Sequence, residues 1–572
     1  MTTHIPREAY SSEELARLYP KELELQLVQI LLRHGERSPV SPRFQNAGLR
    51  PYWPYCKAAT QLTGVIMATT DWSNWDQLKY RRRLETFGMD DGPVIASGPK
   101  GEFDAVCSLT TTLVEKGHDA RAGSELSAIF LPAKGEFAEF TRQPGELTDK
   151  GRETTLALGQ RLRNLYVDLL RFMPALISDS DMIYLRATPI PRALESVQQA
   201  FYGFYPPTSR TADFPTPTII TRTPADETLF PNDSNCRRFA HLSRAFAQRT
   251  ADRWNDTDDM RYLSSLWSKW MPNNAAVAVD SHPRVSGIMD TVNSTDAHGP
   301  LTKLPTEFYD PRARQIIDKV SVEEWFSGYK ESDEYRMLGI GALLGDITAR
   351  MAGSVERNGS DGLLEIGGVD GHLGRGRGGE QDIKLALSGC HDTTLAAALT
   401  SLGAYDVEHW PPFTSHIAFE LFRKKAVSPQ PSAQPVQRSA SDEQIKTRDN
   451  VTATTQGWWA ALFGKAKTAA TQDSAPAAVP KGIGRKPLTQ LTPQQREELR
   501  EYYVRIRFND RVMQVPGCKP AGKHLDGDAS FCTLEAFKSI VDQYTPKNWK
   551  QACAAPLEAP AFPAQVEPAG YE

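Results

Sequence analysis

The chain has 572 residues, of which 40% are hydrophobic, and its formal net charge is −4 at pH 7. A chain of this length and composition has ample apolar material for a large core. The nearly neutral charge gives no electrostatic case for nucleic acid binding. No apolar run approaches the roughly 18 residues of a membrane-spanning helix. We therefore expect a large soluble protein that acts on a small molecule.

The N-terminal segment and the cysteines bear on the compartment. Residues 1–26 lack a charged-then-apolar leader and are rich in glutamate, which argues against both secretory and mitochondrial signals. The seven cysteines form an odd, sparse set, which suits a reducing compartment. We therefore expect a cytoplasmic location. Cys518 and Cys532 flank a short loop and could form a disulfide, but their spacing alone does not decide this.

The first strong pattern is a buried strand over residues 23–32, followed directly by the sequence RHGERSP. Ligands of open α/β sheets bind at the carboxyl ends of strands, so this position suits a functional site. Arg33 and Arg37 stay charged at any relevant pH, and each can donate paired hydrogen bonds to phosphate oxygens. Their positive field favours the neutral imidazole of His34, which is a competent nucleophile at phosphorus.

The next predicted elements are a helix, a strand and a second helix. Residues 145–166 predict a helix that Thr148 caps, because its leucines recur at helical spacing. Residues 181–188 predict a short strand that ends at Arg186, and a helix is expected over 192–202. A lone arginine at a strand end is more often a solvated charge, so Arg186 carries weight only beside the other motifs.

Residues 201–351 form a helical, aromatic-rich stretch. Most of its tryptophans are interpreted as hydrophobic core; they are Trp254, Trp267, Trp270 and Trp325. The glycine-rich segment 367–379 lacks the preceding strand and following helix of a nucleotide-binding loop, so we assign it no such role.

A second buried strand is predicted over residues 383–389, in an apolar run that ends in His391 and Asp392. A helix is expected to follow over 393–402, with Gly403 as its stop. The order of the predicted strands along the chain implies an α/β fold with a mostly parallel central sheet and helices on both faces.

From residue 425 to about 491 the composition shifts to Pro, Ser, Ala, Gln and Thr, which predicts a disordered insertion. The insertion separates strands at 416–422 and 502–508, which we expect to pair as antiparallel edge strands. It also contains a short amphipathic segment, which could contact a membrane surface or a protein partner, with a collapsed patch on the protein as an equal alternative. The apolar residues of that segment are Trp458, Trp459, Leu462 and Phe463.

The pattern R-H-G-x-R-x-P at residues 33–39 is the signature of the histidine acid phosphatases, and all of its fixed positions match, so the chain resembles this family. The resemblance covers nearly the whole chain. It implies a phosphoglycerate mutase-like α/β core with an inserted helical cap, residues 201–351, that covers the phosphate site and selects the substrate. The core would then comprise residues 1–200, 352–424 and 492–572. Phosphoglycerate mutases themselves share R-H-G-E but lack the arginine and proline found here at Arg37 and Pro39.

By this resemblance, His34 is the nucleophile that forms a phosphohistidine intermediate. The phosphate-binding residues are then Arg33, Arg37, Arg186 and His391. Arg192 resembles the family's second arginine and is interpreted either as structural or as a residue that supports the phosphate-binding residues. The resemblance makes Asp392 the donor of a proton to the leaving alkoxide, and the chemistry agrees, because a carboxyl beside a phosphate dianion has a raised pKa. We expect an acid pH optimum, since Asp392 must be protonated while His34 is neutral.

The sequence contains no H-E-x-x-H motif, no cysteine pairs at zinc spacing and no clustered aspartates, so we expect a metal-independent enzyme without a cofactor. The substrate would be a small-molecule phosphate monoester. Within the family, residues 184–196, 225–232 and 410–413 are most similar to members that act on lysophosphatidic acid, a lysophospholipid. That resemblance also makes a mitochondrial location the alternative to the cytoplasm.

Two further alternatives remain for the function. An inositol phosphate or phytate phosphatase would favour a strongly basic pocket, which the cap sequence does not obviously provide. A non-catalytic phosphate-binding scaffold would be expected to have lost at least one of the six site residues, and all six are present.

Overall fold

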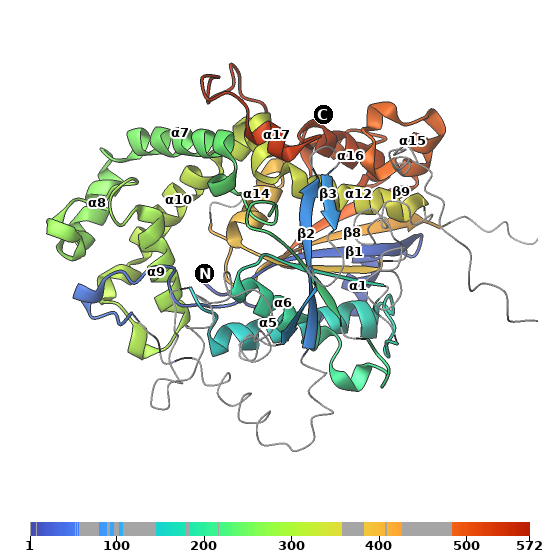
Figure 1. Cartoon of the computed structure of the whole chain (residues 1–572), viewed down its shortest axis with the longest axis horizontal. Helices are drawn as coiled ribbons and strands as arrows, with labels where there is room; N and C mark the ends of the chain where they lie inside the picture. Colours follow the sequence, from blue (N-terminus) through green and yellow to red (C-terminus); the bar gives the residue numbers. More distant parts are fainter. Residues whose placement is uncertain are drawn as a thin grey trace, which may run out of the picture. The chain divides into compact units, whose positions relative to one another are not determined.

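The computed structural model describes residues 2–6, 8–51, 53, 55, 145–178, 180, 182–215, 217–356, 383–405, 409–425 and 483–572, and the backbone of three strands between residues 79 and 106 (Figure 1). The glycine-rich segment 367–379 and the amphipathic segment around Trp458 lie outside the described residues.

The described strands form one twelve-stranded sheet in the order β11-β12-β9-β8-β1-β7-β5-β6-β2-β3, with β10 paired to β9 and β4 to β2. The strands are β1 (Leu23–Arg33), β2 (Lys79–Gly88), β3 (Gly92–Ile95), β4 (Glu102–Val106), β5 (Ile183–Ala187), β6 (Thr218–Arg222), β7 (Leu385–Cys390), β8 (His416–Lys424), β9 (Tyr502–Phe508), β10 (Arg511–Met513), β11 (His524–Leu525) and β12 (Asp528–Thr533). Strands β1, β7, β5, β6 and β2 run parallel, so the predicted mostly parallel centre is confirmed.

Strands β8 and β9 pair antiparallel as predicted, but neither is an edge strand. β8 lies between β1 and β9, and β9 lies between β8 and β12. The prediction failed because the C-terminal strands β11 and β12 extend the sheet beyond the predicted edge.

The described helices cover both faces of the sheet, which confirms that prediction (Figure 1). They are α1 (Ser12–Leu18), α5 (Asp149–Arg163), α6 (Pro191–Phe204), α7 (Arg237–Trp254), α8 (Asp258–Trp267), α9 (Val285–Ala297), α10 (Pro311–Glu331), α11 (Asp333–Arg336), α12 (Ala342–Glu356), α14 (Asp392–Ser401), α15 (Pro493–Arg500), α16 (Leu534–Gln543) and α17 (Trp549–Cys553). Figure 1 shows α5 and α6 on one face and α12, α14 and α16 on the other.

The sequence of strand β1 is apolar almost throughout because both of its faces are covered. Val28, Ile30 and Leu32 pack in the cluster that includes α5 and α6, whereas Leu27 and Leu31 pack in the large cluster on the opposite face. Successive side chains of a strand point to opposite faces, so a sheet covered on both sides needs apolar residues at every position.

Helices α7 to α10 form the cap beside the sheet (Figure 1). The predicted cap range, 201–351, is too wide, because β6 lies within the sheet and α12 packs against β1 and α16. The C-terminal end of the predicted insertion is also wrong. Ile483, Leu488 and Leu491 are buried in the large hydrophobic cluster, so residues 483–491 belong to the folded body. No helix within the described ranges is long and apolar enough to span a bilayer.

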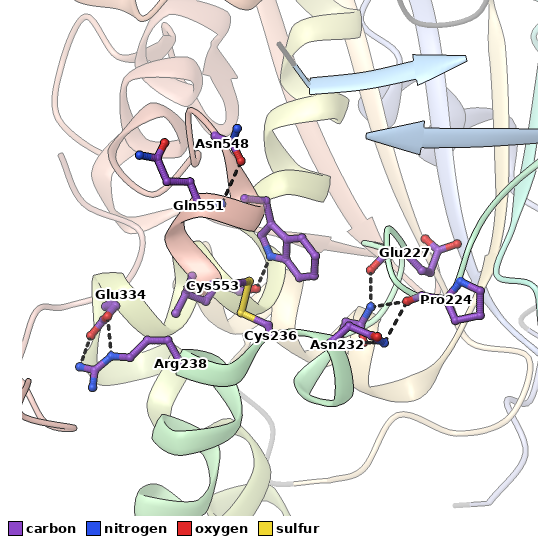
Figure 2. The surroundings of a disulfide bond; sticks show 12 residues. Pro224, Glu227, Asn232, Cys236, Arg238, Glu334, Asn548, Gln551 and Cys553 are labelled. Carbon is purple, nitrogen blue, oxygen red and sulfur yellow. Dashed lines mark hydrogen bonds and ion pairs between the residues drawn. A yellow bond between two sulfur atoms is a disulfide. The ribbon is translucent and has the colours of Figure 1, made fainter. Parts of the chain in front are cut away.

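Four cysteines form two disulfides, Cys518–Cys532 and Cys236–Cys553. The sequence spacing of Cys518 and Cys532 did not decide whether they pair, and the structure shows that they do. The second was not predicted, because its partners are 317 residues apart in the sequence. It joins the segment that begins α7 to the end of α17, and Figure 2 shows the Arg238–Glu334 ion pair nearby, at 2.8 Å. The reading of the cysteines as reduced thiols is therefore wrong for these four.

Candidate active site

The two predicted motifs meet at the carboxyl ends of neighbouring strands. β1 and β7 run parallel, with Arg33 paired in register with Cys390. The backbone N–H of His34 donates to the carbonyl of Cys390 at 3.0 Å, and the rings of His34 and His391 lie 5.5 Å apart. The order and direction of these strands thus bring RHGERSP and His391-Asp392 together, as predicted.

Close packing against α5 fixes the loop that follows β1. A Cβ atom at Gly35 would lie 2.2 Å from the carbonyl oxygen of Gly151, so this position has room only for glycine. Thr148 caps α5 as predicted, accepting from the Gly151 N–H, and its own backbone N–H donates to the Glu36 carbonyl at 3.0 Å. The start of α5 therefore determines the direction of the chain around His34.

His34 has the tautomer and charge that a nucleophile needs. Its Nδ1 lies 2.8 Å from the Gly35 carbonyl oxygen, which can only accept, so Nδ1 carries the proton and the lone pair is on Nε2. Burial lowers the pKa of His34 well below 6.5, and the charges of Arg192, Arg37 and Arg33 lower it further. Burial and these charges therefore favour the neutral imidazole, in the direction expected from the sequence.

Arg33 and Arg37 are buried at the same site, and carboxylates bind both. Arg33 Nη2 lies 2.7 Å from Asp392 Oδ2, and the Arg33 guanidinium stacks 4.1 Å from the centre of the Phe413 ring. Arg37 Nη1 lies 2.8 Å from Oδ1 of Asp290, on cap helix α9. Asp290 was not predicted. No local pattern marks it, because its contact with Arg37 spans 253 positions.

The surroundings of Arg186 and Arg192 differ from those that the predicted roles suggest. Arg186 Nη2 lies 2.8 Å from Glu227 Oε1, and its Nη1 lies 3.7 Å from Asp346 Oδ2. Arg186 is therefore held by carboxylates. Arg192 is instead the charge that most lowers the pKa of His34, and it is also the leading charge acting on His391. The Nε atom of Arg192 is buried without a hydrogen-bond partner, so it can still donate to a ligand.

The alternation of β5 explains why Arg186 points elsewhere. Ile183, Leu185 and Ala187 pack on the α5 and α6 face, whereas Tyr184 packs on the opposite face. Arg186 follows Tyr184 by two positions and shares its face, toward Asp346 of α12. Thr188, which follows the predicted end of this strand at Arg186, does reach the site: its Oγ1 lies 3.0 Å from Nε2 of His391.

Asp392 is ionised in this structure. Burial alone would raise its pKa, but Arg33, Arg37 and a hydrogen bond from Trp410 outweigh burial and lower the pKa to about 2. The raised pKa expected from sequence refers to Asp392 beside a bound phosphate, and it stays a prediction. His391 is neutral, because burial and the charge of Arg192 lower its pKa to about 3.

A cleft opens beside Arg33 and Trp410. Its described walls come from α9, α10, the N-terminal segment and the loop before β8; the lining residues are Thr2, Arg33, Asn293, Arg314, Gln315, Asp318, His409, Trp410, Pro411 and Pro412. Arg314 lies 2.7 Å from Asp296, and Asp318 lies 3.5 Å from His409. The described cleft is thus lined mainly by polar and charged residues, and each of its two arginines is paired with a carboxylate. Among the described residues, no group of three or more His, Cys, Asp or Glu could hold a metal ion.

Comparison with known proteins shows what this chain is similar to. Residues 24–444 match the family model of the histidine phosphatase superfamily, branch 2. A probable acid phosphatase of Schizosaccharomyces pombe is 32% identical over 535 residues, covering 94% of this chain and 95% of the relative. Human lysophosphatidic acid phosphatase type 6 is 24% identical over 407 residues, covering 70% of this chain and 74% of the relative. A Hafnia alvei phytase solved with tartrate is 12% identical, with a TM-score of 0.46, over 94% of this chain and all of that chain (100%).

Proposed function

Because the chain belongs to branch 2 of the histidine phosphatase superfamily and is a histidine acid phosphatase, we propose that it cleaves phosphate monoesters through a covalent phosphohistidine at His34. The observation that carries this proposal is the tautomer of His34, whose Nδ1–H is held by its own loop while Nε2 keeps its lone pair. Attack by Nε2 forms the N–P bond as the bond between phosphorus and the leaving oxygen breaks.

Three arginines support the binding of the phosphoryl group. The substrate phosphate would accept from the buried, unpaired Nε–H of Arg33, and it would displace Asp290 from Arg37, since its charge exceeds that of the carboxylate. Arg192 adds a third guanidinium with a free Nε donor. These charges would neutralise the phosphoryl oxygens in a buried site, which is the task a metal ion performs in other phosphatases. We propose that no metal takes part.

Asp392 would supply the proton that the leaving alkoxide needs. The lowered pKa of Asp392 favours its carboxylate form, so Asp392 must take up a proton when the phosphate binds. The negative charge of the bound phosphate would raise the pKa of Asp392 and so favour this protonation. The proton can arrive on the substrate monoanion, because the second pKa of a phosphate monoester is about 6. This favours turnover at acid pH. In the second half-reaction the Asp392 carboxylate would accept a proton from the attacking water.

For the substrate, we propose lysophosphatidic acid as the first candidate. Two observations support it: the similarity to the human lysophosphatidic acid phosphatase, and the charge balance of the described cleft, which does not favour a polyanion such as phytate. The segment around Trp458 and Phe463 would help the enzyme reach such a substrate at a membrane surface.

A substitution series with p-nitrophenyl phosphate tests the mechanism. His34→Ala should lose nearly all activity, whereas His241→Ala, on cap helix α7, should retain it. Excess EDTA should leave the wild-type rate unchanged. Substantial activity in His34→Ala would contradict the covalent mechanism, and inhibition by EDTA would contradict metal independence.

A further inference from the structure

Trp410 makes a direct hydrogen bond to the carboxylate of Asp392. Its indole Nε1 donates to Oδ2 at 2.8 Å, and Arg33 Nη2 contacts the same oxygen at 2.7 Å. The other oxygen, Oδ1, accepts from the backbone N–H of Thr393 at 2.8 Å. The two carboxylate oxygens of Asp392 therefore have different surroundings.

This asymmetry decides where a proton can sit. A carboxyl oxygen that acts as a carbonyl has two lone pairs, and Trp410 and Arg33 occupy both of them at Oδ2. An indole N–H can donate but never accept, so Oδ2 cannot carry a proton directed at Trp410. When Asp392 is neutral, its proton therefore lies on Oδ1. The backbone N–H of Thr393 can still donate to a lone pair of the protonated oxygen.

The cap holds the indole of Trp410 in place. The Trp410 ring lies 5.0 Å from the ring of Phe326 and 6.1 Å, edge-on, from that of Trp325, both on helix α10. Trp410 is only 9% exposed. The same loop also fixes Arg33, because the Pro411 carbonyl accepts from Arg33 Nη1. One short loop, pinned by the cap, thus orients both the phosphate-binding arginine and the acid.

We propose that Trp410 is a positioning residue for proton transfer, which keeps Oδ2 of Asp392 as an acceptor so that Oδ1 delivers the proton to the leaving oxygen. In this step the O–H bond at Oδ1 breaks, its electron pair stays on Asp392, and the proton joins the electron pair released from the P–O bond. The proposal rests on the proposed function, because it requires Asp392 to be the general acid.

The test compares two leaving groups in the full-length enzyme. Trp410→Phe keeps the ring packing against α10 and removes only the N–H donor. It should lower kcat for an alkyl phosphate such as glycerol 3-phosphate by at least about tenfold relative to p-nitrophenyl phosphate, whose good leaving group needs no proton. Trp254→Phe is the matched control, since its indole also donates to a carboxylate, that of Glu323 at 3.0 Å, but in the cap away from the site.

The pH dependence of kcat distinguishes the loss of the Trp410–Asp392 hydrogen bond from a loss of packing, because a loss of packing alone would not change the pKa of Asp392. The hydrogen bond from Trp410 favours the carboxylate, so its removal should raise the pKa of Asp392 and move the alkaline limb of kcat for the alkyl substrate to higher pH. The other groups that act on Asp392 stay unchanged in the variant; they are Arg33, Arg37, Arg192 and His391.

Asp392→Asn separates this proposal from the proposed function. If Asp392→Asn slows both substrates equally, the acid assignment itself fails. If Asp392→Asn is selective for the alkyl substrate but Trp410→Phe is not, with a rate ratio within about twofold of wild type, the role of Trp410 is refuted while the proposed function stands. Selectivity in both variants, and none in Trp254→Phe, supports the positioning role.

Discussion

Arg186 and Glu227 form a fully buried ion pair, with 2.8 Å between Nη2 and Oε1. The same carboxylate oxygen accepts from the backbone N–H groups of Thr228 and Leu229, at 2.8 and 2.7 Å. The pair therefore shapes the loop whose next residue, Phe230, places its ring 5.8 Å from that of His391. We therefore propose that Arg186 supports the loop beside His391 and that Arg33, Arg37 and Arg192 bind the phosphate.

Breaking this pair should cost stability more than phosphate affinity. Arg186→Met leaves Glu227 buried without its partner, and we expect the free energy of unfolding to fall by about 3–5 kcal/mol. Inhibition by inorganic phosphate should remain close to wild type in the folded fraction. Arg186→Met combined with Glu227→Gln removes both charges and should recover part of the stability. A large loss of phosphate affinity with unchanged stability would contradict this role.

Arg192 should show the opposite behaviour. Arg192→Gln removes a charged donor from the phosphate site, so the Ki for inorganic phosphate should rise by about 10- to 100-fold. Because Arg192 lowers the pKa of His34, its removal should raise that pKa, and protonated imidazole should appear at higher pH. The acid limb of kcat/KM should then move to higher pH. If neither the Ki for phosphate nor the acid limb of the kcat/KM profile changes, Arg192 does not bind phosphate and has a structural role.

The contrast between these arginines shows what the sequence could and could not predict. The two motifs that follow predicted strands were sufficient to predict that His34 and His391 lie close together, since neighbouring parallel strands bring their carboxyl ends together. The ion pair of Arg186 with Glu227 could not be predicted, because both faces of β5 are buried and the sequence does not show which helix covers each face. The contact of Asp290 with Arg37 could not be predicted from the sequence, since it depends on how the cap packs against the sheet.

Asp392→Asn should discriminate between leaving groups. A positioned general acid contributes about 10²- to 10⁴-fold, so hydrolysis of an alkyl phosphate should fall by at least about 100-fold. Hydrolysis of p-nitrophenyl phosphate should fall much less, since p-nitrophenolate leaves without a proton. Steady-state rates at the wild-type pH optimum measure both.

Removal of the insertion should leave the chemistry intact. The described residues continue from Ile483, which is buried, so we choose residues 426–482 for replacement by a short flexible linker. Turnover of p-nitrophenyl phosphate should stay within about twofold of wild type, because none of the site residues lies in that range. If the Trp458 segment contacts membranes, the deletion should slow hydrolysis of lysophosphatidic acid in vesicles. Equal vesicle activity in both proteins would exclude that membrane role.

The most direct test of the account is the covalent intermediate. The enzyme is mixed with ³²P-labelled p-nitrophenyl phosphate, quenched within milliseconds in alkali, and digested for peptide mapping. We predict an alkali-stable, acid-labile phosphoryl group on His34, which accumulates in Asp392→Asn because the base for the attacking water is lost. Absence of labelled enzyme in both proteins during active turnover, or label on a residue other than His34, would contradict it.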